Sequence, residues 1–159
     1  MNFDGVNEKT LVLLKPDAVQ RGLVGEITLR LERKGLKVVG LKMMRLTSEL
    51  LKDHYSHIFD KPFYPGVEAF MLENPVVVIC VEGRSAVEAT VQITGVTNAA
   101  KADAGTVRGD FALGMSNVIH RSDSVENAKD EISRFFEENE IFEYDKTDWM
   151  HVYLEEERA

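Results

Sequence analysis

The segment at residues 76–81 restricts the fold most, because its six residues (Val-Val-Val-Ile-Cys-Val) are all apolar. An uninterrupted apolar run of this length is typical of a strand that is buried on both faces. We expect this strand to end at Gly83 and a helix to follow over residues 86–93.

Strand and helix patterns alternate along the rest of the chain. Strands are expected at residues 10–14, 37–46 and 117–119, and the second of these should carry Val39, Leu41 and Met43 on one side. Helices are expected after Pro16, along Val24, Ile27 and Leu31 up to Gly35, from Ser48 to about Ile58, over 67–72, and from Val125 to Phe136. This order predicts an α/β sandwich built from split βαβ units.

The remaining segments have no clear period. The 159 residues fit one domain, with a loose N-terminus at 1–8 and an irregular tail at 143–159. Residues 59–65 contain two prolines and three aromatics and should form a bent connection. Residues 95–114 are rich in small side chains and glycine. A loop that long inside a compact domain is usually functional.

Charge and cysteine content narrow the class of protein. The formal net charge of −8 argues against a nucleic-acid binder that works through a basic face. Cys80 is the only cysteine, so no disulfide can form within the chain, and a reducing, cytoplasmic setting is expected. No apolar stretch approaches the roughly 20 residues needed to span a bilayer, so no membrane partner is expected.

The stretch Asn-Val-Ile-His-Arg-Ser-Asp-Ser at residues 117–124 is the main functional candidate. Asp123 and Glu126 have the spacing of a capping box, which starts the next helix near Val125. His120 is therefore expected at a strand end, just before a helix N-terminus that favours anions. Such a histidine is either a phosphate-directed nucleophile or a core or capping residue.

Three other residues have both a functional and a structural interpretation. Glu131 could hold an imidazole in one tautomer, or be a solvated helix residue. Lys15, at a strand end, is either a phosphate ligand or a surface charge, and Arg108 alone is weak support for an anion site. His54, His57 and His151 are interpreted as surface or core residues. Neither of the common phosphate loops nor a zinc-type Cys/His spacing occurs in the sequence.

Several segments together resemble the nucleoside diphosphate kinase family. In family order they begin at Thr10, Gln20, Lys34, His54, Lys61, Pro75, Gly105 and Asn117, and they read TLVLLKPD, QRGLVGE, KGLKVVGLK, HY, KPF, PVVV, GTVRGDF and NVIHRSDS. They cover about residues 9–150. The resemblance implies a ferredoxin-like α/β sandwich with a four-stranded antiparallel sheet covered by helices. It also implies transfer of the γ-phosphoryl of a nucleoside triphosphate, typically ATP, to a nucleoside diphosphate, by a ping-pong mechanism through phospho-His120.

The resemblance also implies roles for the matching residues. Catalysis would rest on His120, with Glu131 accepting from its other ring nitrogen, and on Ser122, Lys15 and Tyr55. The nucleotide would be bound by Lys15, Phe63, Thr97, Arg108 and Asn117, with Phe63 stacking on the base. Mg²⁺ would be carried by the nucleotide phosphates, with few protein ligands. A homo-hexamer, arranged as a trimer of dimers, is the expected assembly.

Two departures from the family pattern concern phosphate binding. Val91 stands where the family usually has an arginine, and Arg121 stands where it prefers a small residue. Losing one charge-assisted contact, worth roughly 1.5–3 kcal/mol, should weaken binding or turnover. Arg121 either replaces part of the missing guanidinium or points into solvent.

A third departure lies in the long loop. The run from Phe111 to Asn117 is one residue shorter than expected, and Ala99 and Ala104 stand where prolines are common. Both alanines should loosen this loop, which packs at a threefold subunit contact in the family.

Two other functions compete with an active kinase. One is a nucleotide-binding regulatory relative with weakened turnover, motivated by Val91. The other is a DNA-binding regulator, which the net charge disfavours.

Overall fold

The sheet of the predicted sandwich is present. The computed structural model describes residues 7–114 and 116–157. Its four strands are β1 (Asn7–Leu14), β2 (Lys37–Met44), β3 (Val76–Arg84) and β4 (Ile119–Arg121), in the order β2-β3-β1-β4. Every pairing is antiparallel. This confirms the four-stranded antiparallel sheet, covered by helices, of the ferredoxin-like α/β fold.

Strand β3 confirms the prediction made for residues 76–81, because all six side chains are buried. It pairs with β1 on one side and β2 on the other. The expected end at Gly83 is wrong, since the strand continues to Arg84 and Gly83 pairs with Glu8. A Cβ at Gly83 would come within 3.0 Å of the Leu36 side chain, so the glycine permits close packing and does not end the strand.

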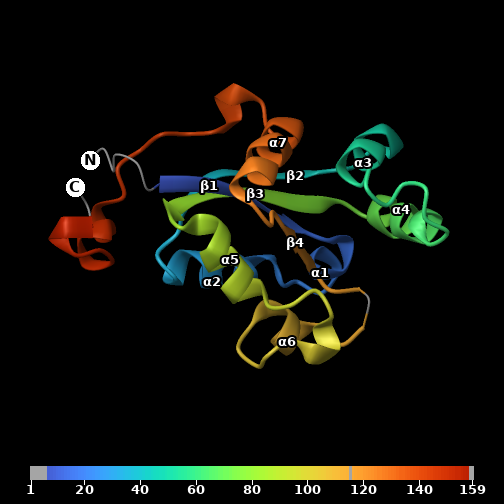
Figure 1. The fold of residues 1–159 in the computed structure, drawn as a ribbon, viewed down its shortest axis with the longest axis horizontal. Helices are drawn as coiled ribbons and strands as arrows, with labels where there is room; N and C mark the ends of the chain where they lie inside the picture. The colour runs from blue at the N-terminus through green and yellow to red at the C-terminus, as the bar shows by residue number, and fades with distance from the viewer. Residues whose placement is uncertain (1–6, 115, 158–159) are drawn as a thin grey trace.

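Helices cover both faces of the sheet (Figure 1). One face carries α1 (Pro16–Gln20), α2 (Val24–Arg33), α5 (Ala86–Thr94) and α6 (Val107–Phe111), and the other carries α3 (Ser48–His54), α4 (Tyr64–Glu73) and α7 (Val125–Phe135). Alternate residues of β1 divide between the two cores: Val12 and Leu14 face the first layer, and Leu11 and Leu13 face the second. Both faces of the sheet are therefore packed against helices and carry a buried core.

Several predicted helix boundaries need correction. Thr47, not Ser48, caps α3, because its side chain accepts from the Leu50 N–H at 3.2 Å, and the helix ends at His54 instead of Ile58. Helix α4 begins at Tyr64, inside the segment expected to be a bent connection, because Pro65 is tolerated in a first helical turn. Ser124, not Asp123, caps α7: it accepts from the Asn127 N–H at 3.1 Å. The N-cap is therefore one residue later than expected, and the residue three positions after it is Asn127, not the glutamate of the expected capping box.

The strand boundaries also differ from expectation. Asn7 and Glu8 belong to β1, although residues 1–8 were expected to be loose; residues 1–6 lie outside the described part. In β2 the pairing register shifts between Val38 and Gly40. Val39 is consequently buried, whereas Leu41 and Met43 are 52% and 60% exposed. The prediction that these three side chains lie on one side of the strand is therefore wrong.

The segment at 95–114 is not an unstructured loop. It contains the 3₁₀ turn η1 (Ala99–Lys101) and helix α6, which Thr106 caps by accepting from the Gly109 N–H at 3.0 Å. Helix α6 could not be recognised from the sequence, because it has too few apolar positions to show a helical period.

The tail beyond Phe142 packs against the corner between α2 and β2. After η2 (Glu138–Glu140) it forms two short 3₁₀ turns, η3 (Thr147–His151) and η4 (Glu155–Glu157). Trp149 is buried and donates from its indole nitrogen to the Gly35 carbonyl at 2.9 Å. Lys37 pairs with Glu82 at 2.8 Å and lies over the rings of Tyr144 and Trp149. Among the described residues, no helix is long and apolar enough to cross a membrane.

Candidate active site

A strained turn leads into β4. Val118 has a φ of +58°, a conformation that β-branched residues rarely adopt. The Ile119 N–H donates to the Asn117 carbonyl at 2.7 Å across this turn. Val118 itself is held from both sides, since its N–H donates to the Asp17 carboxylate at 3.1 Å and its carbonyl accepts from the Lys15 N–H at 2.9 Å. The turn makes β4 begin at Ile119, not at Asn117 as predicted, and ties it to the end of β1.

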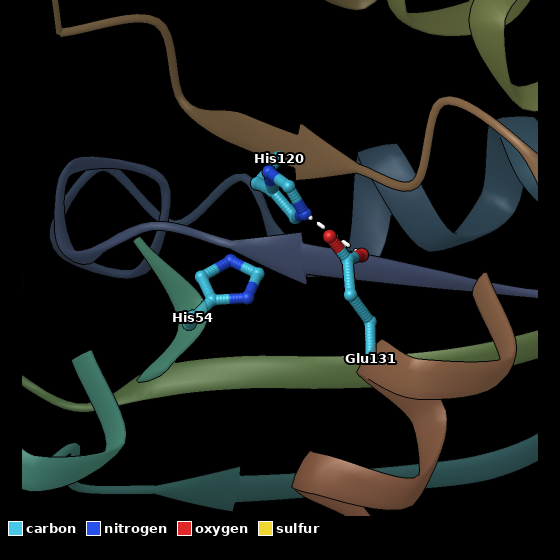
Figure 2. A group of neighbouring side chains, drawn as sticks. All are labelled: His54, His120 and Glu131. Atoms are coloured by element: carbon cyan, nitrogen blue, oxygen red, sulfur yellow. Dashed lines mark hydrogen bonds and ion pairs between the residues drawn. The ribbon is translucent and has the colours of Figure 1, made fainter. Parts of the chain in front are cut away.

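His120 lies in the middle of β4 and faces Glu131 on α7. Its Nε2 is 3.0 Å from a Glu131 carboxylate oxygen, and the Ser122 hydroxyl donates to the same oxygen at 2.6 Å. Burial alone would raise the pKa of Glu131, but the hydrogen bonds from His120 and Ser122 lower it. An ionised Glu131 fixes the proton of a neutral His120 on Nε2. Nδ1 then carries the free lone pair, and Figure 2 shows it pointing away from Glu131.

His54 is the residue that the sequence interpretation missed. It is buried at the end of α3, and its ring packs edge-on against His120 with centroids 4.6 Å apart (Figure 2). Neither of its ring nitrogens has a hydrogen-bond partner among the described residues. Burial, with His120 close by, lowers the pKa of His54 to about 3, so the ring is neutral at ordinary pH. The only available signal was its place beside Tyr55 in a matching segment.

The lowered pKa of His54 gives a prediction about acid stability. The unfolded chain binds a proton at His54 near pH 6.5, whereas the folded chain does so only near pH 3. Stability should therefore fall as the pH drops below about 6.5, and at pH 4.5 this one group should account for about 2–3 kcal/mol. His54→Phe should flatten the dependence by that amount, while the fall due to Glu131 persists. Urea unfolding at pH 7 and 4.5 measures the difference, with exposed His57→Phe as the matched control. If His54→Phe and the wild type lost the same free energy of unfolding between pH 7 and pH 4.5, the prediction would be contradicted.

Tyr55 follows His54 directly. It is half-buried, its ring centroid lies 4.7 Å from that of His54, and burial next to Glu131 raises the pKa of its hydroxyl to about 12. Among the described contacts, none joins Tyr55 directly to His120. The structure thus places Tyr55 beside the site, and the ring of His54 contacts both Tyr55 and His120.

Lys15, Asn117 and Thr97 form a chain of contacts at the segment that leads into β4. The Lys15 ammonium donates to the Asn117 side-chain carbonyl at 2.6 Å, and the Asn117 amide donates to the Thr97 main-chain carbonyl at 3.0 Å. Burial, together with the charge of Arg108, lowers the pKa of Lys15 to about 8. Thr97 itself is exposed.

Arg108 supports the strand that carries His120. Its guanidinium donates to the carbonyls of Gly95 at 2.9 Å and Ile119 at 2.8 Å, and the residue is only 4% exposed. Burial and the neighbouring Arg121 lower the pKa of Arg108 to about 10. A buried guanidinium among other cations provides a strong electrostatic site for an anion.

Phe63 lies apart from these contacts. It precedes α4 and is 58% exposed, and within residues 7–114 and 116–157 no hydrogen bond or ring contact connects it to His120. An exposed aromatic ring at a helix start is available to stack on a planar ligand, but the described contacts do not bring Phe63 to His120.

The assembled groups suit phosphoryl chemistry. An imidazole with a free Nδ1, a carboxylate that accepts from its other nitrogen, and cations at Lys15 and Arg108 can take up a phosphoryl group. His54, His120 and Glu131 are also the only described group of three metal-ligating residues, with ligand atoms within 4.8 Å of one another. A metal held there would occupy the imidazole of His120 and the carboxylate of Glu131, so this group does not provide a separate metal site.

Comparison with known proteins points in one direction. The family model described as nucleoside diphosphate kinase matches residues 8–141. A nucleoside diphosphate kinase from Parabacteroides distasonis is 45% identical over 151 residues, covering 94% of this chain and 99% of the relative. Another from Thermomicrobium roseum is 51% identical over 140 residues, covering 87% and 94%. The solved structure of a halophilic nucleoside diphosphate kinase from Halobacterium salinarum, in complex with CDP, has a TM-score of 0.90 at 42% identity and covers 93% and 99%.

Proposed function

Because the chain belongs to the nucleoside diphosphate kinase family, and is therefore a phosphotransferase, we propose that it works by a ping-pong mechanism through phospho-His120. The γ-phosphoryl of a nucleoside triphosphate, typically ATP, would pass to His120 and then to a nucleoside diphosphate. The observation that carries this proposal is the His120–Glu131–Ser122 arrangement, which leaves Nδ1 free and oriented.

The two half-reactions use the same atoms in opposite directions. In the first, the Nδ1 lone pair forms the N–P bond while the bond from the γ-phosphorus to the bridging oxygen breaks, and the nucleoside diphosphate leaves. The imidazole becomes more cationic as the bond forms, and the Glu131 carboxylate at 3.0 Å stabilises that charge. In the second, an oxygen of another diphosphate takes the phosphoryl group and restores neutral His120.

The surrounding residues would bind the nucleotide in both half-reactions. Lys15 and Arg108 supply positive charge for the phosphates, and Asn117 and Thr97, linked at 3.0 Å, would face the ribose and phosphates. Phe63 would stack on the base, and its 58% exposure leaves the ring available. Tyr55 would support His120 through the ring of His54.

Enzymes of this family need a divalent cation, and we propose that it is Mg²⁺ bound to the nucleotide phosphates. Mg²⁺ prefers oxygen ligands and keeps several waters. Glu131 is engaged by His120 and Ser122, whereas Asp17 accepts from the Val118 N–H with one oxygen and has its other oxygen buried without a hydrogen-bond partner among the described residues. We propose that the cation would arrive on the substrate phosphates and would neutralise part of their charge there. Lys15 and Arg108 remain the groups of this chain that hold the phosphates.

We further propose the expected homo-hexamer, as a trimer of dimers. Within the described residues β2 is an outer strand of the sheet, and the side chains of Leu41 and Met43 are exposed on it. An unpaired edge with apolar side chains favours association of copies. A cytoplasmic setting stays a prediction from the sequence.

Incubation of the purified protein with γ-labelled ATP and Mg²⁺ tests the mechanism. We expect about one acid-labile, alkali-stable label per chain, which moves to GTP when GDP is added. Parallel initial-rate lines in ATP and GDP are expected for ping-pong kinetics. Exchange without a labelled protein intermediate would contradict it.

The rival functions have less support. The comparisons give no support to the regulatory relative, because the matching relatives are named as kinases. DNA binding stays disfavoured by the net charge of −8.

A further inference from the structure

Arg121 ends β4 and lies on the opposite side of the strand from His120. In the β1–β4 pairing His120 is opposite Leu13 and Arg121 is opposite Val12, and these two residues of β1 belong to different core layers. β4 is an outer strand, so a ligand just beyond its edge can be reached from both layers. Arg121 and His120 can therefore act on different parts of one ligand.

The charges around this edge are unbalanced. Arg121 is close enough to Arg108 for its charge to lower the pKa of Arg108, and Arg108 does the same to Lys15. Within the described residues, no carboxylate forms an ion pair with any of these three side chains. The Asp17 carboxylate raises the pKa of Lys15 but does not outweigh burial and the charge of Arg108, which lower it. In a chain with a net charge of −8, three cations at one edge without an ion pair among the described residues favour binding of an anion.

Two buried donors at this edge also lack partners. The Nε atoms of Arg108 and Arg121 are both buried without a hydrogen-bond partner among the described residues. A buried donor is normally satisfied, by ligand if not by protein. Arg121 is also only partly exposed. This disfavours the alternative, considered from the sequence, that its side chain points into solvent.

Helix α5 packs on β4 and offers no cation of its own. Its sequence, AVEATVQIT, contains neither lysine nor arginine, and Val91 lies one turn before Gly95, whose carbonyl accepts from Arg108. A second guanidinium beside Arg108 can therefore come from β4 but not from α5.

We propose that Arg121 binds the phosphates of the nucleotide that are not transferred, acting with Arg108. This inference rests on the proposed function, because it assumes a nucleotide whose γ-phosphoryl reaches His120. Arg121 lies on the other side of β4 from His120, so it contributes mainly to affinity and little to the phosphoryl-transfer step. A planar guanidinium suits this task better than an ammonium because it can donate two parallel hydrogen bonds to one phosphate.

Calorimetric titration with ADP and Mg²⁺ tests the inference on the full chain. Arg121→Gln, which keeps much of the side-chain length, should raise the Kd for ADP by about tenfold to a hundredfold. Arg121→Lys, which keeps the charge, should lose less. The rate of His120 phosphorylation at saturating ATP should change by less than about threefold. Exposed Arg33→Ala is the matched control and should bind ADP as wild type does.

A second arginine provides the rescue. Adding Val91→Arg to Arg121→Gln should recover most of the lost ADP affinity, because α5 would then supply the missing guanidinium. An unchanged Kd in Arg121→Gln overturns the inference, and so does a folded double variant with no recovery. Absence of phosphohistidine in the wild type would instead refute the proposed function, since ADP binding is measured without turnover.

Discussion

Replacing His120 by asparagine is expected to abolish phosphoryl exchange, with a loss of at least about 10⁴-fold in kcat. Asparagine is smaller than histidine, and its amide nitrogen corresponds to the position of Nδ1, not to the Nε2 that lies 3.0 Å from Glu131. It has no nucleophilic nitrogen, because the amide lone pair is delocalised. The fold and the cation set stay in place, so ADP should still bind with a Kd close to that of wild type.

The measurement for His120→Asn is a coupled exchange assay together with labelling by γ-labelled ATP. His57→Asn, at an exposed histidine, is the matched control and should retain full activity. Residual exchange above about one per cent of the wild-type rate, with label on the protein, would show that another group accepts the phosphoryl. His54 would be the first residue to examine, because its ring packs on His120 with centroids 4.6 Å apart.

Gly109→Ala is expected to have the largest effect on stability. A Cβ at Gly109 would lie 2.0 Å from the Asp103 carbonyl oxygen and 2.6 Å from its carbon, both main-chain atoms. The turn cannot yield easily, because the Asp103 carbonyl also accepts from the Thr106 hydroxyl at 2.6 Å. We expect a loss of about 3 kcal/mol, which lowers the Tm by roughly 10 °C in a chain of this size.

The same substitution should disturb nucleotide binding. Gly109 follows Arg108 in α6, so moving the helix start shifts the guanidinium away from the Gly95 and Ile119 carbonyls. Thermal unfolding and ADP titration measure the two effects. Gly25→Ala is the matched control: that glycine lies in α2, its Cβ would meet nothing within 4 Å, and the change should stabilise by roughly 0.5 kcal/mol. A wild-type Tm for Gly109→Ala would contradict the prediction.

The fold could be predicted where local pattern and burial agree. The apolar run of β3 identified the central strand, and the period of Val24, Ile27 and Leu31 identified α2. Helix α6 could not be found in this way, because five residues that include a glycine carry little periodic signal. The bulge at Val39 likewise depends on pairing with β3, which no local pattern shows.

The candidate site was predictable as a set of residues but not as an arrangement. The stretch around His120 and the position of Glu131 were visible in the sequence, and the structure brings the two side chains to 3.0 Å. The turn at Val118 was not visible, because valine is a poor choice for a positive φ and only contacts with Lys15 and Asp17 impose it. His54 was interpreted as a surface or core residue, because no local pattern shows that its ring packs on His120.

The packing of Trp149 against Gly35 bears on the order of events in folding. Their hydrogen bond joins residues 114 positions apart, so its formation closes a very long loop. Contacts of such separation are reached after local helices and hairpins have formed. The contacts of the tail should therefore be absent from the folding transition state. Such contacts lower the unfolding rate and leave the folding rate nearly unchanged. The C-terminal tail, which is distant in the fold from β4 and its His120 (Figure 1), should therefore lengthen the lifetime of the native state.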